Sequence, residues 1–63
     1  MEINKTVDLN LNGMDGNAYV IMAAFSKQAK REGWTQEEID HVLTEAKTSD
    51  YDHLLQTLIH YTN

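Results

Sequence analysis

The sequence predicts a mainly α-helical single domain, 1–63, in which an N-terminal β-strand precedes a compact three-helix bundle and pairs with a second copy. Apolar and polar residues alternate near the start of the chain, and apolar residues then recur every three or four positions through three stretches. The chain has 63 residues and no cysteine, so its core is small and has no disulfide to stabilise it. Self-association is a common way to stabilise such a core.

The strand is expected over residues 3–11, where Val7, Leu9 and Leu11 alternate with polar neighbours. The rest of the sequence offers no second strand to pair with it. An isolated strand leaves backbone N–H and C=O groups without partners, and its edge is a template for another chain. Three outcomes stay open: antiparallel pairing with a second copy, addition to another protein's sheet, or an extended arm packed or frayed against the helices. Symmetry favours the homodimer.

A first helix is expected over residues 17–32, after the turn formed by "GMDG", and either Asp15 or Asn17 is positioned to cap its start. Apolar residues cover more of this helix than one core needs, so a second side is expected to face the dimer partner. The predicted dimer interface combines strand and helix residues: Val7, Leu9, Leu11, Tyr19, Val20 and Ala23.

The second helix is expected over residues 36–47, because Thr35 and Glu38 have the spacing of a capping box. Gly33 is predicted to end the preceding helix in the left-handed conformation.

The third helix is expected over residues 50–61, with Ser49 as its cap and Asp50 as a competing cap. The core is expected to contain one apolar stripe from each helix: Ile21, Phe25, Trp34, Ile39, Leu43, Leu54, Leu55 and Leu58.

The stretch "EGWTQEEIDHVLTEAKTSDYDHLLQTL" resembles the later two helices of a ubiquitin-associated (UBA) domain. The matching places are held by Gly33, Trp34, Glu37, Glu38, Leu43 and Leu54. This resemblance implies a UBA-like three-helix shape. Over most of the chain, "DLNLNGMDGNAY", "EGWTQEEID" and "DYDHLLQTL" resemble a group of short, uncharacterised proteins of bacteria and their phages, which implies a prokaryotic or viral setting.

Composition and charge exclude several function classes. The net charge of −5 argues against direct nucleic-acid binding, and no apolar run is long enough to cross a membrane. The first ten residues lack a signal-peptide pattern, so a cytoplasmic location is expected. The serines lie in no catalytic motif, and His41, His53 and His60 lack the spacing of zinc ligands. No catalytic residue, metal or cofactor is therefore predicted, and the protein is not expected to be an enzyme.

The expected function is that of a small protein-interaction module acting as a homodimer, with a phage-encoded modulator or inhibitor of a host protein as the use that the resemblance implies. Its surface for another protein is expected at the acidic residues Glu37, Glu38, Asp40 and Glu45. The alternative is a protein that binds or sequesters a nucleotide or another anion at the dimer interface. That site would use the turn residues Gly13, Asp15, Gly16 and Asn17. A DNA mimic is a third hypothesis.

Overall fold

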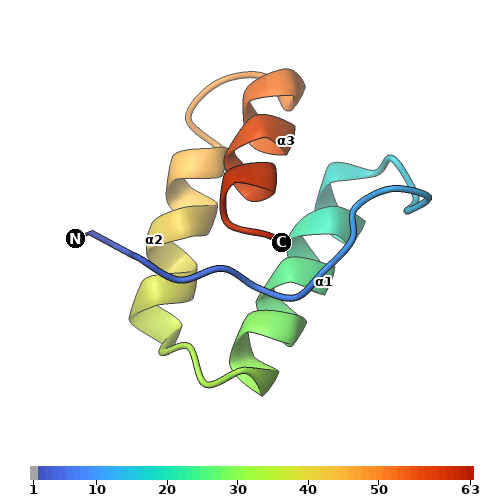
Figure 1. Ribbon diagram of the computed structural model, residues 1–63. Helices are drawn as coiled ribbons and strands as arrows, with labels where there is room; N and C mark the ends of the chain where they lie inside the picture. Colours follow the sequence, from blue (N-terminus) through green and yellow to red (C-terminus); the bar gives the residue numbers. More distant parts are fainter. Residues whose placement is uncertain (1) are drawn as a thin grey trace.

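The computed structural model describes residues 2–63 and contains three helices packed as a bundle (Figure 1). Helix α1 spans Ala18–Arg31, α2 spans Gln36–Ala46 and α3 spans Tyr51–His60. This confirms the predicted three-helix bundle. None of the helices in residues 2–63 is long and apolar enough to cross a membrane.

Helix α1 is capped by Asn17, whose side-chain oxygen accepts a hydrogen bond from the Tyr19 backbone N–H at 2.8 Å. Of the two caps considered from the sequence, the structure uses Asn17. The helix ends before Gly33, which has a φ of +94°. Glycine adopts this left-handed conformation without a steric cost, so the chain can turn sharply into Trp34. The backbone N–H of Trp34 then donates to the backbone carbonyl of Ala29 at 3.0 Å.

The capping box at the start of α2 is formed as predicted. The Glu38 N–H donates to the Thr35 hydroxyl at 3.1 Å, and the Thr35 N–H donates to the Glu38 carboxylate at 2.9 Å. Two N–H groups that have no partner within the helix are thereby satisfied.

Helix α3 is capped by Asp50, so Ser49 is not its cap. The Asp50 carboxylate accepts a hydrogen bond from the His53 N–H at 3.0 Å. A carboxylate is the stronger acceptor, and its negative charge is favoured by the positive end of the helix dipole. The helix therefore starts one residue later than Ser49 would allow.

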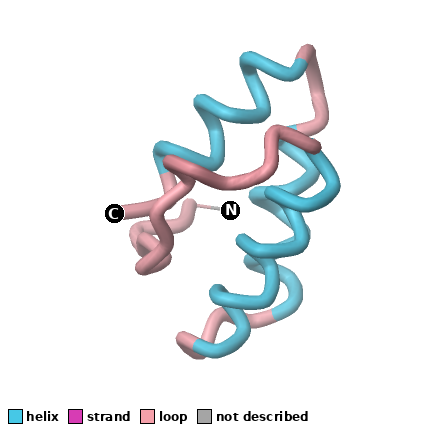
Figure 2. The backbone as a smooth tube through the Cα atoms, turned by 90° about the vertical axis from the view of Figure 1, so that its right-hand side faces the viewer, coloured by secondary structure: helices cyan, strands magenta, loops and turns pink. Residues whose placement is uncertain are grey.

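Residues 3–11 do not form the predicted strand, and no strand is present in the part of the chain that the structure describes (Figures 1 and 2). We call these residues the arm. The arm makes one isolated parallel bridge, between Val7 and Thr62. The Val7 N–H donates to the Tyr61 carbonyl at 2.8 Å, and the Asn63 N–H donates to the Val7 carbonyl at 3.0 Å. The Leu9 N–H also donates to the Val7 carbonyl, at 2.9 Å, so the arm turns there and the ladder stops.

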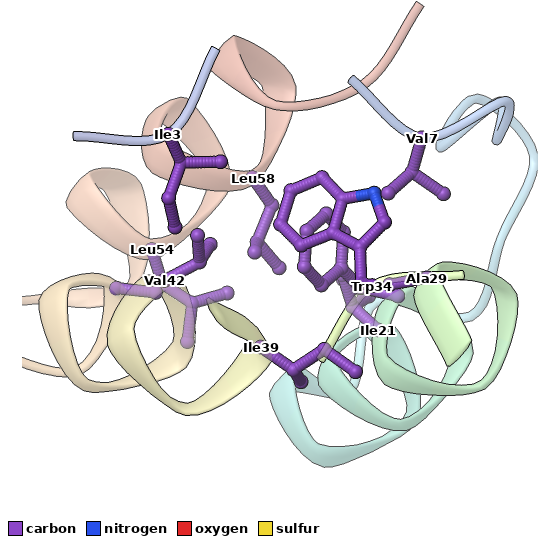
Figure 3. Packing of buried hydrophobic residues seen from close by; sticks show 11 residues of the cluster. Ile3, Val7, Ile21, Ala29, Trp34, Ile39, Val42, Leu54 and Leu58 are labelled. Carbon is purple, nitrogen blue, oxygen red and sulfur yellow. The ribbon is translucent and has the colours of Figure 1, made fainter. Parts of the chain in front are cut away.

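The arm completes the hydrophobic core of its own chain. Ile3 and Val7 are both buried, and they point from the arm toward the helices on either side of Trp34 (Figure 3). Burying each of these side chains stabilises the fold by about 1.5–3 kcal/mol. Val7, predicted at a dimer interface, therefore belongs to the core and not to a free strand edge.

The centre of the core is aromatic. Trp34 packs edge-to-face against Phe25, with the ring centroids 5.6 Å apart, and it also packs against Tyr61 at 6.4 Å. The Lys5 ammonium lies 5.7 Å from the centroid of the Trp34 ring and forms an ion pair with Glu38 at 2.7 Å. The polar position that interrupts the apolar row of the arm is therefore used as a cation over an aromatic ring.

Candidate interaction surface

The predicted interface residues of the arm are not exposed as a continuous edge. Leu9 and Leu11 are partly buried against the core, beside the fully buried Val7. Both leucines line a small hollow of about 190 Å³ next to Ile59 and the C-terminal residues. Because the backbone of Val7 and the apolar side chains of the arm are used within the chain, the arm does not supply the pairing edge that the sequence suggested.

The predicted interface residues of α1 lie together on the surface. Tyr19 is 79% exposed and Val20 is 43% exposed, and Ala23 is exposed beside them. The buried side of the helix carries Ile21 and Phe25, so the exposed group faces away from the core.

Basic residues continue this exposed side toward the end of α1. Lys27 and Lys30 are exposed, and they follow Ala23 at spacings of four and seven residues, which keeps them on one helix face. We call Tyr19, Val20, Ala23, Lys27 and Lys30 the outer face of α1. The helix sequence AYVIMAAFSKQAKR contains no acidic residue, although the whole chain has a net charge of −5. The outer face thus combines an apolar first half with a cationic second half.

A groove of about 270 Å³ runs beside the outer face of α1, toward the connection between α2 and α3. Tyr19 and Met22 line one side, and Tyr51 and Leu54 line the other. The Tyr51 hydroxyl donates to the Gly16 carbonyl at 2.5 Å and so ties the turn to α3. The sequence did not indicate this role, because the helical period groups Tyr51 with the buried Leu54.

Two backbone donors of the turn proposed as an anion site are engaged within the chain. The Asn17 N–H donates to the Asp15 carboxylate at 2.9 Å, and the Met14 N–H donates to the Leu11 carbonyl at 3.3 Å. Gly13 adopts a φ of +82°, as a tight turn requires, and Gly16 is held by Tyr51. An anion that bound the Met14 or Asn17 N–H would have to displace these hydrogen bonds, and it would approach the negative charge of Asp15.

The predicted acidic surface separates into two parts. Glu37, Asp40 and Glu45 are exposed and line a shallow depression of about 400 Å³ on α2. We call these three residues the acidic surface of α2. Glu38 instead faces the arm, where the hydrogen bond from Lys5 and then the backbone hydrogen bond from Thr35 hold the pKa of its carboxyl below the ordinary value. The negative charge of Glu38 therefore stabilises the contact between the arm and α2.

The histidines are surface groups. His53 is the most enclosed of them, and its Nε2 lies 3.1 Å from the Glu45 carboxylate and 3.2 Å from the Thr48 hydroxyl, linking α2 to α3. Within residues 2–63, no three side chains of His, Asp or Glu gather in a group that could hold a metal ion. No family model, curated protein or solved structure matches the chain.

Proposed function

We propose that the chain is a small non-enzymatic protein-interaction module that works as a homodimer in a cytoplasmic setting, with the outer face of α1 as its dimer contact. The observation that carries this proposal is the exposure of Tyr19 at 79% beside Val20 and Ala23. Single apolar residues on a surface are normal, but here three adjacent ones share the first two turns of one helix. Tyrosine is enriched where proteins bind one another.

A second copy is the proposed occupant for two reasons. Two-fold homodimers are the commonest oligomers, and one self-complementary patch is enough to make them. A chain of 63 residues buries about 60% of its unfolded surface when it folds alone, a smaller share than larger domains bury, so association adds a useful apolar contact. The arm has no part in this proposed dimer, since Val7 is hydrogen-bonded within the chain and Ile3 and Val7 are buried in its core.

Sedimentation equilibrium tests the dimer directly. The wild-type chain is expected at twice its mass of 7.2 kDa, and the double variant Tyr19→Ser, Val20→Ser is expected to dissociate about tenfold or more readily. The matched control is Ile59→Ser, which removes an apolar side chain that is 50% exposed on α3. A wild-type chain that stays monomeric at millimolar concentration overturns the proposal.

The dimer would leave the acidic surface of α2 free for a further protein. We propose a basic partner there, because Glu37, Asp40 and Glu45 are exposed and close together. The resemblance to short proteins of bacteria and phages supports a host protein as this partner, which the module would modulate or inhibit. Binding to a bacterial lysate, followed by cross-linking and mass spectrometry, tests this. A captured protein must be lost with the triple variant Glu37→Gln, Asp40→Asn, Glu45→Gln and kept with Asp8→Asn, which changes an exposed acidic residue of the arm.

A further inference from the structure

The charges along α1 also determine how two copies would be oriented. We infer that the two α1 helices pair antiparallel, with the two-fold axis passing beside Ala23. This inference rests on the proposed homodimer and adds its geometry.

Parallel pairing is disfavoured by the distribution of charge. The basic residues of α1 all lie in its second half, and the acidic residue that follows the helix, Glu32, accepts hydrogen bonds from the Gln28 side chain and the Asp8 N–H. A parallel pair would place Lys27 and Lys30 of one copy beside the same lysines of the other copy. Like charges in contact cost free energy, and parallel helix dipoles add to that cost. Antiparallel pairing separates the two cationic ends.

Ala23 is the natural centre of an antiparallel pair. It is exposed in the middle of the outer face, and its small side chain lets two helices approach closely. Tyr19 lies four residues before it and Lys27 lies four residues after it. In an antiparallel pair about Ala23, each Tyr19 therefore faces Lys27 of the partner copy. An ammonium group over a tyrosine ring is attractive, and the symmetry makes this contact twice.

The same symmetry brings opposite charges together at the ends. Asp15 and Arg31 are each eight residues from Ala23, and both are exposed. Each Arg31 would lie near the turn that carries Asp15 of the other copy. The contact is thus apolar at its centre and complementary in charge at its ends, which is what a closed two-fold dimer requires.

Engineered cysteines test this geometry sharply, because the sequence contains no cysteine of its own. With the axis beside Ala23, the two copies of residue 23 face each other and Ala23→Cys is expected to form a disulfide-linked dimer. The two copies of residue 27 would lie roughly 12 Å apart along the helices, at about 1.5 Å per residue, which is beyond the span of a disulfide. Lys27→Cys is therefore expected to form the disulfide-linked dimer at least about tenfold more slowly than Ala23→Cys, because its two copies lie beyond disulfide distance.

Two further variants complete the experiment. Tyr19→Cys combined with Lys27→Cys is expected to cross-link between copies, because these positions face each other. Asp40→Cys, exposed on α2, measures the background rate of random collision. Each variant is oxidised at the same protein concentration, and the dimer is quantified by non-reducing electrophoresis after circular dichroism has shown that the fold is kept.

The outcomes separate this inference from the proposed function. A monomeric wild-type chain in sedimentation overturns both. A dimeric wild-type chain in which Ala23→Cys cross-links no faster than Asp40→Cys overturns the antiparallel geometry and leaves the dimer standing. Equal rates for Ala23→Cys and Lys27→Cys would show parallel pairing. Species larger than a dimer would show that α1 binds the acidic surface of another copy in an open chain.

Discussion

The backbone N–H of Val7 donates to the carbonyl oxygen of Tyr61 at 2.8 Å, and this hydrogen bond joins the arm to the chain just after α3. It places the Val7 side chain in the core, where it is fully buried. The arm is therefore a structural part of the bundle.

Replacing Val7 with alanine is expected to lower the free energy of unfolding by about 2 kcal/mol, because two buried methyl groups are lost and a cavity remains. Urea denaturation followed by tryptophan fluorescence measures the change, since Trp34 is the only tryptophan. The control Asn4→Ala, at an exposed position of the arm, should change the free energy by about 0.5 kcal/mol or less. Equal effects of the two substitutions would contradict burial of Val7.

Replacing Thr35 with alanine removes half of the capping box and is expected to cost about 1 kcal/mol. The matched substitution is Thr44→Ala, which is exposed within α2 and caps nothing. Alanine is the better helix former, so Thr44→Ala should be neutral or slightly stabilising. Thermal unfolding of both variants, monitored by circular dichroism, gives the difference.

The ion pair between Lys5 and Glu38 makes stability depend on pH. The pKa of Glu38 is lower in the folded chain than in the unfolded chain, so the unfolded chain binds the proton more tightly. The stabilisation is complete above the ordinary glutamate pKa of about 4.3, and it is lost as the pH falls through the lowered value.

In Lys5→Met, the pKa of Glu38 is expected to rise toward its ordinary value, and this acid-dependent loss of stability should shrink. Carboxyl NMR titration of Glu38 measures the first effect, and urea midpoints between pH 2 and 6 measure the second. Lys27→Met removes the same charge from the outer face of α1, where it makes no ion pair with Glu38, and should leave the Glu38 titration unchanged. A Glu38 pKa that does not move in Lys5→Met would refute the assigned cause.

Replacing Tyr51 with phenylalanine removes the hydrogen bond to the Gly16 carbonyl and is expected to cost about 1 kcal/mol. Amide hydrogen exchange is expected to become faster in the turn that precedes α1, because the turn loses its hydrogen bond to α3. Tyr19→Phe removes a hydroxyl from an exposed ring and serves as the control. The prediction fails if the turn exchanges at the same rate in both variants.

The helices were predictable because their signals are local. The capping box of Thr35 and Glu38 and the left-handed Gly33 each depend on a few neighbouring residues, and the structure contains both. Predicting Asp50 instead of Ser49 as the cap of α3 required the relative strength of two adjacent acceptors. The spacing of the residues alone does not give that strength.

The position of the arm against the helices was not predictable from local signals of this kind. Alternating apolar residues look the same whether an extended segment pairs with a sheet or packs against helices. The partners of Val7 are Tyr61 and Asn63, more than fifty positions away in the sequence, and nothing local points to them. Lys5 was the one residue that hinted at this position, because a cation in an apolar row needs a partner. In the structure its partners are the Glu38 carboxylate and the face of the Trp34 ring.

The candidate site was partly predictable. The width of the apolar arc on α1 identified Tyr19 and Val20, which are indeed exposed. Glu38 has the spacing of both a cap and a surface acid, and the structure uses it as a cap and as the partner of Lys5. The hydrogen bond from Tyr51 to Gly16 was not predictable, because the helical period groups Tyr51 with the buried Leu54.

The bond between Val7 and Tyr61 also sets an order of events during synthesis. The ribosome produces the arm first, but residues 61–63, on which the arm docks, must emerge before it can bind. Helices α1 and α2 are free to collapse earlier, while Ile3 and Val7 stay open to solvent and to chaperones. Such long-range closure slows folding, so the newborn chain passes through a stage in which these apolar side chains of the arm are exposed, whereas the folded molecule buries them.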